Sequence, residues 1–407
     1  MKKYGLLGKK LGHSYSPEIH KMLGGYDYGL FECMEDELDA FFAAREFQGI
    51  NVTTPYKKAV IPYCDELSPE ARKIGSVNTI IKLPDGRLRG ENTDYAGFVG
   101  IVRRSAAPLD GKILVLGNGG VAPTIRTALA DMGAENIITV SRSGENNYVN
   151  LRRHFDAKLI VNATPLGMYP NNGAAAVDLR QFPCCECVLD PVYNPARTRL
   201  MLDAEKLGIN SCGGLYMLVE QAVNACRLFT GKVISPERTE EVYEIMSIKM
   251  LNVALIGMPG CGKTSVGEKL AALSGRPFAD IDAEIEKRIA MSIPEYFSLH
   301  GESAFREVET EVLAELSKRS GLVIACGGGV VTRSENYGLL HQNSTIVYIK
   351  RGLDELPSEG RPLSLAHSPA ALAEKRLPLY EAWCDISADN SGSIADAANS
   401  IARMLKL

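Results

Sequence analysis

The sequence NVALIGMPGCGKT, residues 252–264, decides the fold of the second half of the chain. It reads as a short apolar strand, a glycine-rich turn and the start of a helix, which we expect over residues 265–273. In the pattern GxxxxGK[ST], backbone N–H groups surround phosphates, the lysine reaches the β and γ oxygens, and the hydroxyl residue binds Mg²⁺. The residues predicted to bind ATP in this way are Gly257, Gly260, Cys261, Gly262, Lys263 and Thr264.

An earlier sequence, KILVLGNGG at residues 112–120, has the same order of strand, glycine-rich turn and helix. Glycines let the backbone approach a pyrophosphate, and a helix N-terminus supplies free N–H groups and a partial positive charge. At the end of the next strand, an acidic residue would favour NAD, whereas Arg142 can pair with the additional phosphate of NADP. A turn made for packing and a solvated arginine are the alternative readings. The predicted NADP site comprises Gly117, Asn118, Gly119, Gly120 and Arg142.

Strands and helices alternate after both turns, so we predict an α/β fold for each half. The expected strands lie at residues 4–7, 49–52, 79–81, 136–140, 159–162, 187–189 and 322–325, and two further helices at 215–230 and 237–245. A chain of 407 residues suits two or three domains. We expect one domain over residues 1–105 and 213–248, a second over 106–212 and a third over 249–407. Residues 246–250 would be a short linker, not rich in Gly or Ser, that prevents free swinging of the halves.

The composition is that of a globular protein, with 45% hydrophobic and 23% charged residues. A net charge of −4 gives no reason to expect a nucleic-acid partner. No apolar run approaches the roughly 20 residues that span a bilayer, and the N-terminus lacks the features of a signal peptide. The 10 cysteines show no metal-binding spacing. We therefore expect a cytoplasmic enzyme with small-molecule partners, and the sequence does not predict its oligomeric state.

Polar residues gather in four segments before the first glycine-rich turn: GHSYSP at 12–17, NVTTPYK at 51–57, SVNT at 76–79 and ENTD at 91–94. Ser14 and Ser16 stand at alternate positions and can grip a carboxylate. The other segments add amides, hydroxyls, an ammonium and a carboxylate. A polar, hydroxylated acid needs many such directional groups, so these segments predict a pocket for that class of substrate.

These segments resemble the shikimate dehydrogenase family across nearly all of residues 1–248. The resemblance is carried by HSYSP, NVTTPYKK, GSVNT, ENTDYAGF, the glycine-rich turn, NATPLGM, DPVYNPART and GGLYMLVEQA, in that order. It implies an N-terminal α/β substrate domain and a Rossmann domain for NADP. The implied site residues are Ser14 and Ser16 for the substrate carboxylate, Thr53, Asn78, Tyr193 and Gln221 for the ring hydroxyls or carboxylate, Lys57 and Asp94 as the catalytic pair, and Thr164 and Gly214 on the nicotinamide side.

The chemistry of the pair agrees with this resemblance. Negative charge builds on a ring ketone as it receives hydride, and the Lys57 ammonium can stabilise that charge and donate the proton. Asp94 would keep the ammonium charged and aimed. The sequence departs from the family at Asn118 and Val121, where alanines are usual, and at SRS 141–143, where NRT is usual. These departures concern the cofactor preference rather than the reaction.

The second half carries further polar elements after its phosphate loop. Asp280 and Asp282 alternate, which would place both carboxylates on one face of an extended segment. Arg306 and Arg376 are candidate forks for a carboxylate. The sequence CGGG at 326–329 leaves backbone room beside a flat ring.

These elements, in order, resemble shikimate kinase over residues 250–407, which implies a P-loop α/β domain like the nucleoside monophosphate kinases, with a central parallel sheet. By resemblance, shikimate binds to Asp282, Arg306, Gly327, Gly328, Gly329 and Arg376, with Asp280 and Thr264 near Mg²⁺ and with Arg361 in the lid, where it would clamp the ATP phosphates. Asp282 would orient the attacking hydroxyl or act as its base. The stretch between Tyr348 and Arg361 is shorter and less basic than is usual in the family, which would weaken ATP binding or let ATP hydrolyse.

The favoured interpretation is a bifunctional enzyme that reduces 3-dehydroshikimate with NADPH and then phosphorylates shikimate with ATP and Mg²⁺. Two alternatives stay open. The first half would act mainly on quinate with NAD, or the second half would be a weak or non-catalytic module that senses shikimate or ATP. The predicted catalytic residues are Lys57, Asp94, Lys263 and Asp282.

Overall fold

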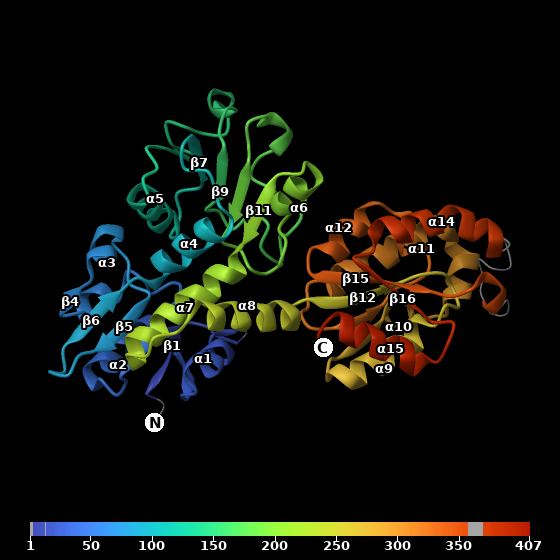
Figure 1. The fold of residues 1–407 in the computed structure, drawn as a ribbon, viewed down its shortest axis with the longest axis horizontal. Helices are drawn as coiled ribbons and strands as arrows, with labels where there is room; N and C mark the ends of the chain where they lie inside the picture. Colours follow the sequence, from blue (N-terminus) through green and yellow to red (C-terminus); the bar gives the residue numbers. More distant parts are fainter. Residues whose placement is uncertain (1–2, 13, 357–368) are drawn as a thin grey trace. The chain divides into compact units, whose positions relative to one another are not determined.

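The computed structural model describes residues 3–12, 14–356 and 369–407. The chain forms two compact units (Figure 1). The first comprises Met1–Tyr193 and Thr198–Met246, and the second comprises Asn194–Arg197 and Ser247–Leu407. In the described ranges, no helix combines the length and apolar character needed to cross a bilayer.

The first unit contains two β-sheets joined by helices. Its strands are β1 (Tyr4–Gly8), β2 (Tyr28–Glu32), β3 (Gly49–Val52), β4 (Glu66–Leu67), β5 (Thr79–Lys82), β6 (Leu88–Glu91), β7 (Lys112–Leu116), β8 (Asn136–Val140), β9 (Leu159–Asn162), β10 (Cys187–Asp190) and β11 (Asn210–Gly213). Its helices are α1 (Ser16–Gly24), α2 (Leu38–Ala44), α3 (Pro69–Ile74), α4 (Thr93–Arg104), α5 (Ala122–Asp131), α6 (Arg199–Lys206), α7 (Gly214–Thr230) and α8 (Pro236–Met250), the last of which runs into the second unit.

The N-terminal sheet has the order β2-β1-β3-β5-β6-β4 and mixes parallel and antiparallel pairs. The other sheet is parallel throughout, in the order β11-β10-β9-β7-β8. Its central strands are apolar and buried, as expected for a sheet covered on both faces. The order in which successive strands join the sheet reverses at β7, with β8 on one side of it and β9 on the other, and ligands of such sheets bind at the carboxyl ends of the strands at this point.

Two packed helices, α4 and α7, connect the sheets of the first unit (Figure 1). The Asn92 side chain accepts a hydrogen bond from the Tyr95 N–H and thereby fixes the start of α4. A Cβ atom added at Gly97 of α4 would lie 2.7 Å from the carbonyl oxygen of Met217 in α7, so this glycine permits the close approach of the two helices.

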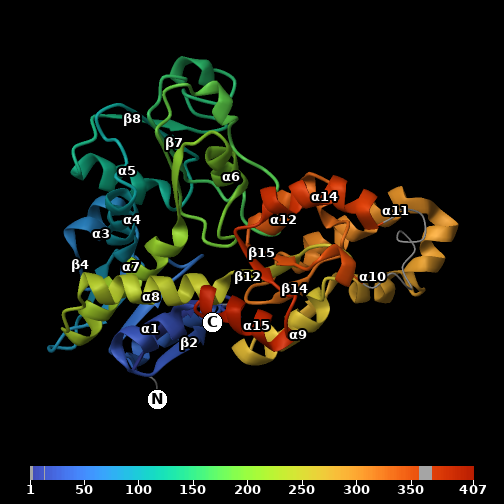
Figure 2. The same ribbon diagram turned by 45° about the vertical axis from the view of Figure 1, so that its right-hand side comes forward.

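The second unit has one parallel sheet in the order β13-β14-β12-β15-β16. Its strands are β12 (Asn252–Ile256), β13 (Phe278–Asp280), β14 (Val323–Ala325), β15 (Ser344–Lys350) and β16 (Ile386–Asp389). Its helices are α9 (Lys263–Ser274), α10 (Ile281–Ile289), α11 (Ile293–Leu316), α12 (Glu335–His341), α14 (Pro369–Trp383) and α15 (Ile394–Met404). Helices α9 and α15 pack together on one face of the sheet, and α12 and α14 lie on the other (Figure 2).

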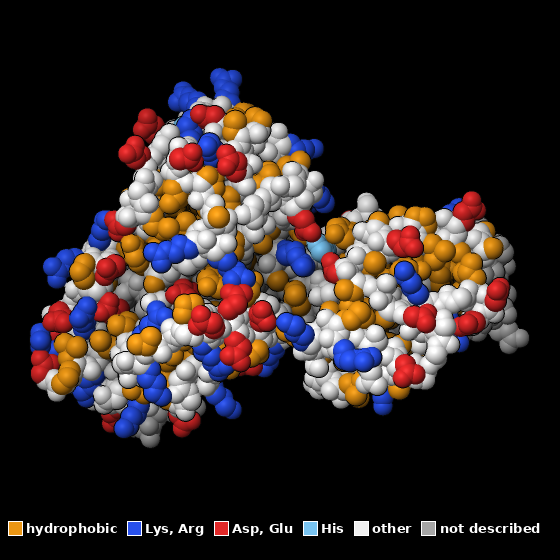
Figure 3. Space-filling view, viewed as in Figure 1, with side chains coloured by type: hydrophobic (Ala, Val, Ile, Leu, Met, Phe, Trp, Pro, Cys, Tyr) orange, Lys and Arg blue, Asp and Glu red, His pale blue; other side chains and the backbone are white. Residues whose placement is uncertain are grey.

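The α/β class and the parallel sheets are confirmed, and the strands expected at residues 49–52, 136–140 and 159–162 are β3, β8 and β9. The expected linker at residues 246–250 is wrong, because α8 continues through Met250 and only Leu251 precedes β12. Met246 and Met250 are buried, so the helical stripe of apolar side chains extends through these residues. Charged side chains of both signs are interspersed over the visible face of each unit (Figure 3), in keeping with the small net charge.

Two candidate active sites

The first site centres on the ion pair between Lys57 and Asp94. Lys57 lies in the loop after β3, and Asp94 lies in the first turn of α4. The Lys57 Nζ atom is 2.5 Å from Asp94 Oδ2, with side-chain exposures of 33% and 16%. The fold therefore joins two predicted catalytic residues that are far apart in sequence, and leaves both accessible to a ligand.

A buried polar cluster surrounds the start of α4. The Asn78 Oδ1 atom accepts a hydrogen bond from the Thr93 N–H at 2.7 Å. The Thr93 hydroxyl lies 3.5 Å from Gln221 Oε1, so α7 brings Gln221 to the same place. Two predicted substrate-binding residues, Asn78 and Gln221, thus share one hydroxyl neighbour beside Asp94.

The remaining predicted substrate residues come from three loops. Ser14 Oγ accepts a hydrogen bond from the Ser16 N–H at 3.2 Å, which ties the two serines together at the start of α1. The Tyr193 ring meets the ring of Tyr15 edge-on, with centroids 6.4 Å apart, so the loop after β10 adjoins the serine segment. Burial raises the pKa of Tyr193 above its ordinary value. The Thr53 N–H donates to the Leu7 carbonyl at 3.0 Å and joins the end of β3 to β1.

A cavity of about 760 Å³ lies at the carboxyl ends of β7, β8 and β9. Its lining includes Gly117, Asn118, Gly119, Ser141, Arg142, Ser143, Tyr148, Thr164 and Leu166. Gly117 has a φ of +99°, and a Cβ atom there would lie 2.6 Å from Thr164 Cγ2, so only glycine suits this turn. This cradle of close backbone, with a basic side chain at the strand end, fits a dinucleotide that carries an additional phosphate.

Two predicted cofactor residues, Gly120 and Gly214, are not among the described residues that line this cavity. Gly214 instead packs on the loop after β10, where a Cβ atom would lie 1.9 Å from the Pro191 carbonyl oxygen. The sequence reasoning did not select Tyr148, which lies in the loop after β8 and lines the cavity. Tyr148 lies outside the motifs quoted from the sequence, so no local pattern marked it as a cofactor residue.

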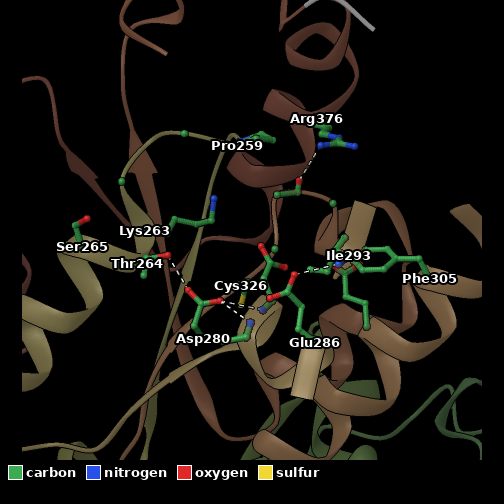
Figure 4. Close-up of a pocket in the computed structure, with 18 of the residues that line it drawn as sticks. Pro259, Lys263, Thr264, Ser265, Asp280, Glu286, Ile293, Phe305, Cys326 and Arg376 are labelled. Carbon is green, nitrogen blue, oxygen red and sulfur yellow. Dashed lines mark hydrogen bonds between the residues drawn. The ribbon is translucent and has the colours of Figure 1, made fainter. Parts of the chain in front are cut away.

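The second site is a cavity of about 770 Å³ around the glycine-rich loop before α9 (Figure 4). The Lys263 side chain points into the loop, where its Nζ atom donates to the carbonyls of Gly257 and Met258, both at 3.0 Å. Of the predicted ATP residues, Gly260, Gly262, Lys263 and Thr264 line the cavity, whereas Gly257 and the buried Cys261 are not among its described lining residues. Arg361 lies outside the described residues, as does part of the predicted short lid.

Thr264 and Asp280 provide adjacent oxygen atoms at the end of this loop. The Thr264 hydroxyl donates to Asp280 Oδ2 at 2.7 Å. Mg²⁺ prefers oxygen ligands and usually keeps several waters with only one or two protein side chains, so this pair fits that ion. Among the described residues no larger cluster of His, Cys, Asp or Glu could hold a metal.

The expectation that Asp280 and Asp282 share an extended segment is wrong. Asp280 ends β13 and caps α10, because its Oδ1 atom accepts from the Asp282 N–H at 2.9 Å. Asp282 therefore lies in the first turn of the helix. Both residues still line the cavity, since the strand end and the helix start meet there.

Arg306 is buried beside a carboxylate that the sequence reasoning missed. Its Nη1 atom donates to Glu309 Oε2 at 2.7 Å, and its Nη2 atom lies 3.3 Å from Glu302 Oε1. Burial raises the pKa of Glu309, and the nearby Arg306 guanidinium opposes that rise. Both side chains line the cavity. The spacing of three residues on one helix was the available signal for this pair.

The triglycine segment passes directly over these groups. A Cβ atom at Gly329 would lie 2.1 Å from Arg306 Nη2, and one at Gly327 would lie 2.5 Å from Glu309 Oε1. The Gly328 carbonyl accepts from Arg376 Nη1 at 3.2 Å and from the Tyr380 hydroxyl at 2.5 Å. The predicted shikimate residues Asp282, Arg306, Gly327, Gly328, Gly329 and Arg376 thus line one cavity.

Family models match a part of each unit. A family model described as shikimate dehydrogenase substrate binding domain matches residues 6–80, and one described as shikimate kinase matches residues 259–406. The NADP(+)-dependent shikimate dehydrogenase of Clostridium perfringens strain SM101 is 36% identical over 266 residues, which cover 60% of this chain and 98% of the relative.

Solved structures give the same result for the first unit. A chorismate mutase/shikimate 5-dehydrogenase fusion protein from Clostridium acetobutylicum is 35% identical with a TM-score of 0.56, covering 60% of this chain and 96% of that one. Shikimate 5-dehydrogenase from Thermus thermophilus, solved with NADP(H) and shikimate, is 32% identical with a TM-score of 0.55, covering 60% and 99%. The chain therefore belongs to the shikimate dehydrogenase family and carries a shikimate kinase domain after the dehydrogenase part.

Proposed function

We propose that this chain is a bifunctional enzyme that reduces 3-dehydroshikimate to shikimate with NADPH and then phosphorylates shikimate to shikimate 3-phosphate with ATP and Mg²⁺. One observation carries the proposal: one chain holds both an accessible Lys57–Asp94 pair and a P-loop cavity with buried arginines. The two parts of the chain match two families whose names share one compound, shikimate. The product of the first reaction is the substrate of the second.

In the reduction, bound NADPH supplies the hydride to the ring ketone. The Lys57 ammonium stabilises the charge that develops on the ketone oxygen and donates the proton to it. Asp94, 2.5 Å away, orients Lys57 and offsets its charge. Ser14, Ser16, Thr53, Asn78, Tyr193 and Gln221 hold the substrate, and Arg142 selects the additional phosphate of NADP.

In the phosphorylation, bound Mg²⁺ offsets the charge of the ATP phosphates. Lys263 exchanges its present bonds to the Gly257 and Met258 carbonyls for phosphate oxygens. Arg306 and Arg376 bind the shikimate carboxylate. Asp282, at the cavity wall, accepts the proton of the attacking hydroxyl. Thr264 and Asp280 are the residues that would hold the metal.

We also propose that the functional domains are residues 1–105 with 213–248, residues 106–212, and residues 249–407, and that the enzyme works in the cytoplasm. The two sheets of the first unit and the single sheet of the second support the division. A continuous α8 implies that the last boundary falls within a helix rather than in a loop.

The test is a coupled assay on the purified full chain, which follows NADPH consumption and ADP release after addition of 3-dehydroshikimate. We expect both signals, with ADP release appearing only after shikimate has formed. NADPH consumption without shikimate-dependent ADP release would reduce the second half to a ligand-binding module. Faster turnover of quinate with NAD than of shikimate with NADP would contradict the assigned substrate and cofactor.

A further inference from the structure

A carboxylate with no cationic partner in the described structure lies at the end of β10. Asp190 is fully buried. Burial raises its pKa to about 6, although its hydrogen bonds oppose the rise. The carboxylate accepts from Asn162 Nδ2 at 3.0 Å, from the Thr198 hydroxyl at 2.7 Å and from the Val192 N–H at 3.1 Å. A buried charge is costly, so such a group requires either a structural or a functional reason.

On one side, Asp190 fixes the orientation of an amide. Because Asn162 donates its Nδ2 atom to Asp190, its Oδ1 atom faces the opposite way and accepts from the Thr164 N–H at 3.0 Å and the Thr164 hydroxyl at 2.6 Å. The Thr164 hydroxyl in turn accepts from the Leu166 N–H at 3.2 Å. Thr164 and Leu166 line the dinucleotide cavity. If the Asn162 amide were reversed, its NH₂ group would face the Thr164 N–H, which is also a donor. The hydrogen bonds of the cavity wall therefore depend on the acceptor at Asp190.

On the other side, Asp190 holds the loop that carries Tyr193. The Val192 N–H bonds to Asp190, and the Val192 carbonyl accepts from the Gly214 N–H at 3.0 Å. Tyr193 follows directly and contacts the ring of Tyr15 beside the serine segment. The two loops also meet, because a Cβ atom at Gly167 would lie 3.0 Å from Thr198 Cβ.

We propose that Asp190 is a positioning residue that fastens the cofactor loop at residues 163–168 and the substrate loop at residues 191–193 to one buried acceptor, and so sets the binding of both reactants. This inference rests on the proposed reductase function. It assigns no chemistry to Asp190, which is fully buried and is not among the described residues that line the dinucleotide cavity. The arrangement is a matched set: a buried carboxylate accepts from a buried amide, a buried hydroxyl and a partly buried main-chain N–H.

The test compares Asp190→Asn with the exchange variant Asn162→Asp/Asp190→Asn in the full chain. In the single variant, the new NH₂ group at residue 190 faces groups that are themselves hydrogen-bond donors. We therefore expect the NADP⁺ dissociation constant, measured by calorimetry, to rise at least tenfold. The KM values for NADPH and 3-dehydroshikimate should rise about tenfold, with kcat changed less than threefold. In the exchange variant, the carboxylate at residue 162 accepts from Thr164, and the amide at residue 190 donates to that carboxylate. This variant should therefore recover most of the lost NADP⁺ binding. Asp178→Asn, an exposed carboxylate paired with Arg180 in the same part of the chain, is the matched control.

Kinase activity of the same samples reports the integrity of the second unit. Wild-type binding constants in a folded Asp190→Asn protein would overturn the inference, and so would an exchange variant no better than the single one. If Asp190→Asn does not fold, Thr198→Val decides, because it removes one donor to Asp190 and Thr198 is not among the described residues that line the cavity; it should raise the NADP⁺ dissociation constant. A wild-type chain that binds NADP⁺ but reduces no 3-dehydroshikimate would refute the proposed function, while the NADP⁺ titrations would still test Asp190.

Discussion

The Nζ atom of Lys57 lies 2.5 Å from Oδ2 of Asp94, although 37 residues separate them along the chain. One residue comes from the loop after β3 and the other from the first turn of α4, whose start is fixed by Asn92. The pair is accessible from one side and supported by buried polar groups on the other. This geometry supports the proposed role of Lys57 as the proton donor to a bound ketone.

Replacing Lys57 should separate the two activities. We expect Lys57→Ala to lower ketone reduction by about 10²- to 10⁴-fold, because general acid catalysis contributes on that order. Shikimate phosphorylation by the same protein should stay within twofold of wild type, and Lys263→Ala should do the reverse. Steady-state rates of both reactions check this, with Lys73→Ala, in an exposed ion pair with Asp131, as control. Loss of both activities in either folded variant would refute the assignment of two independent sites.

Cofactor preference should depend on Arg142, an exposed side chain at the wall of the dinucleotide cavity. Arg142→Ala should raise the KM for NADPH about tenfold and leave the KM for NADH nearly unchanged, because only the former has the additional phosphate. The measurement is the ratio of kcat/KM for the two cofactors. Arg152→Ala removes another exposed arginine that is not among the cavity residues and should leave the ratio unchanged.

A side chain at Gly329 should displace the Arg306 guanidinium. A Cβ atom there would lie 2.1–2.2 Å from three atoms of the Arg306 guanidinium, so Gly329→Ala must displace that group from Glu309. We expect a rise of more than tenfold in the KM for shikimate, with a much smaller change in the KM for ATP. Gly338→Ala is the matched control, since nothing lies within 4 Å of the added Cβ atom there. Equal effects of Gly329→Ala on both substrates would indicate general distortion instead.

The stability of the first unit should carry a pH signature of Asp190. Its folded pKa, about 6, is above the ordinary value of 3.8, so folding favours the protonated form. Its contribution to stability is therefore fully present below the ordinary value and is lost as pH rises through about 6.

Asp190→Asn removes this titration. The difference in unfolding free energy between wild type and variant should thus shift in favour of the variant, by on the order of 1 kcal/mol, between pH 5 and pH 7.5. Urea unfolding of both proteins, followed by the signal of the first unit, measures the shift. A difference independent of pH would show that Asp190 titrates as it does in water.

Local patterns in the sequence predicted much of this molecule. Strands β3, β8 and β9 and both glycine-rich turns follow from short apolar runs and from glycines that end them. Site residues on motif-bearing loops, such as Lys57 and Lys263, were found for the same reason. Asp282 was placed on the wrong element because the capping role of Asp280 was not recognised.

Other site residues depend on contacts that sequence reasoning cannot see. Glu309 gains its importance from a buried arginine one helical turn away and from the glycines that cross it. Asp190 directly follows the strand expected at residues 187–189, yet Asn162 of β9 and Thr198 at the far end of the next loop both bond to it. The roles of such side chains depend on contacts made in the tertiary structure, which a local sequence pattern does not reveal.

The end of α8 determines where a separately expressed kinase fragment should begin. The Arg276 guanidinium donates to the main-chain oxygens of Ile248 and Leu251, at 2.5 and 2.6 Å, and covers the last turn of that helix. A kinase fragment that began at Asn252 would strip both acceptors from a half-buried cation. A separately expressed phosphotransferase should therefore start upstream of Ser247, so that the fragment keeps the last turn of α8 before its first strand.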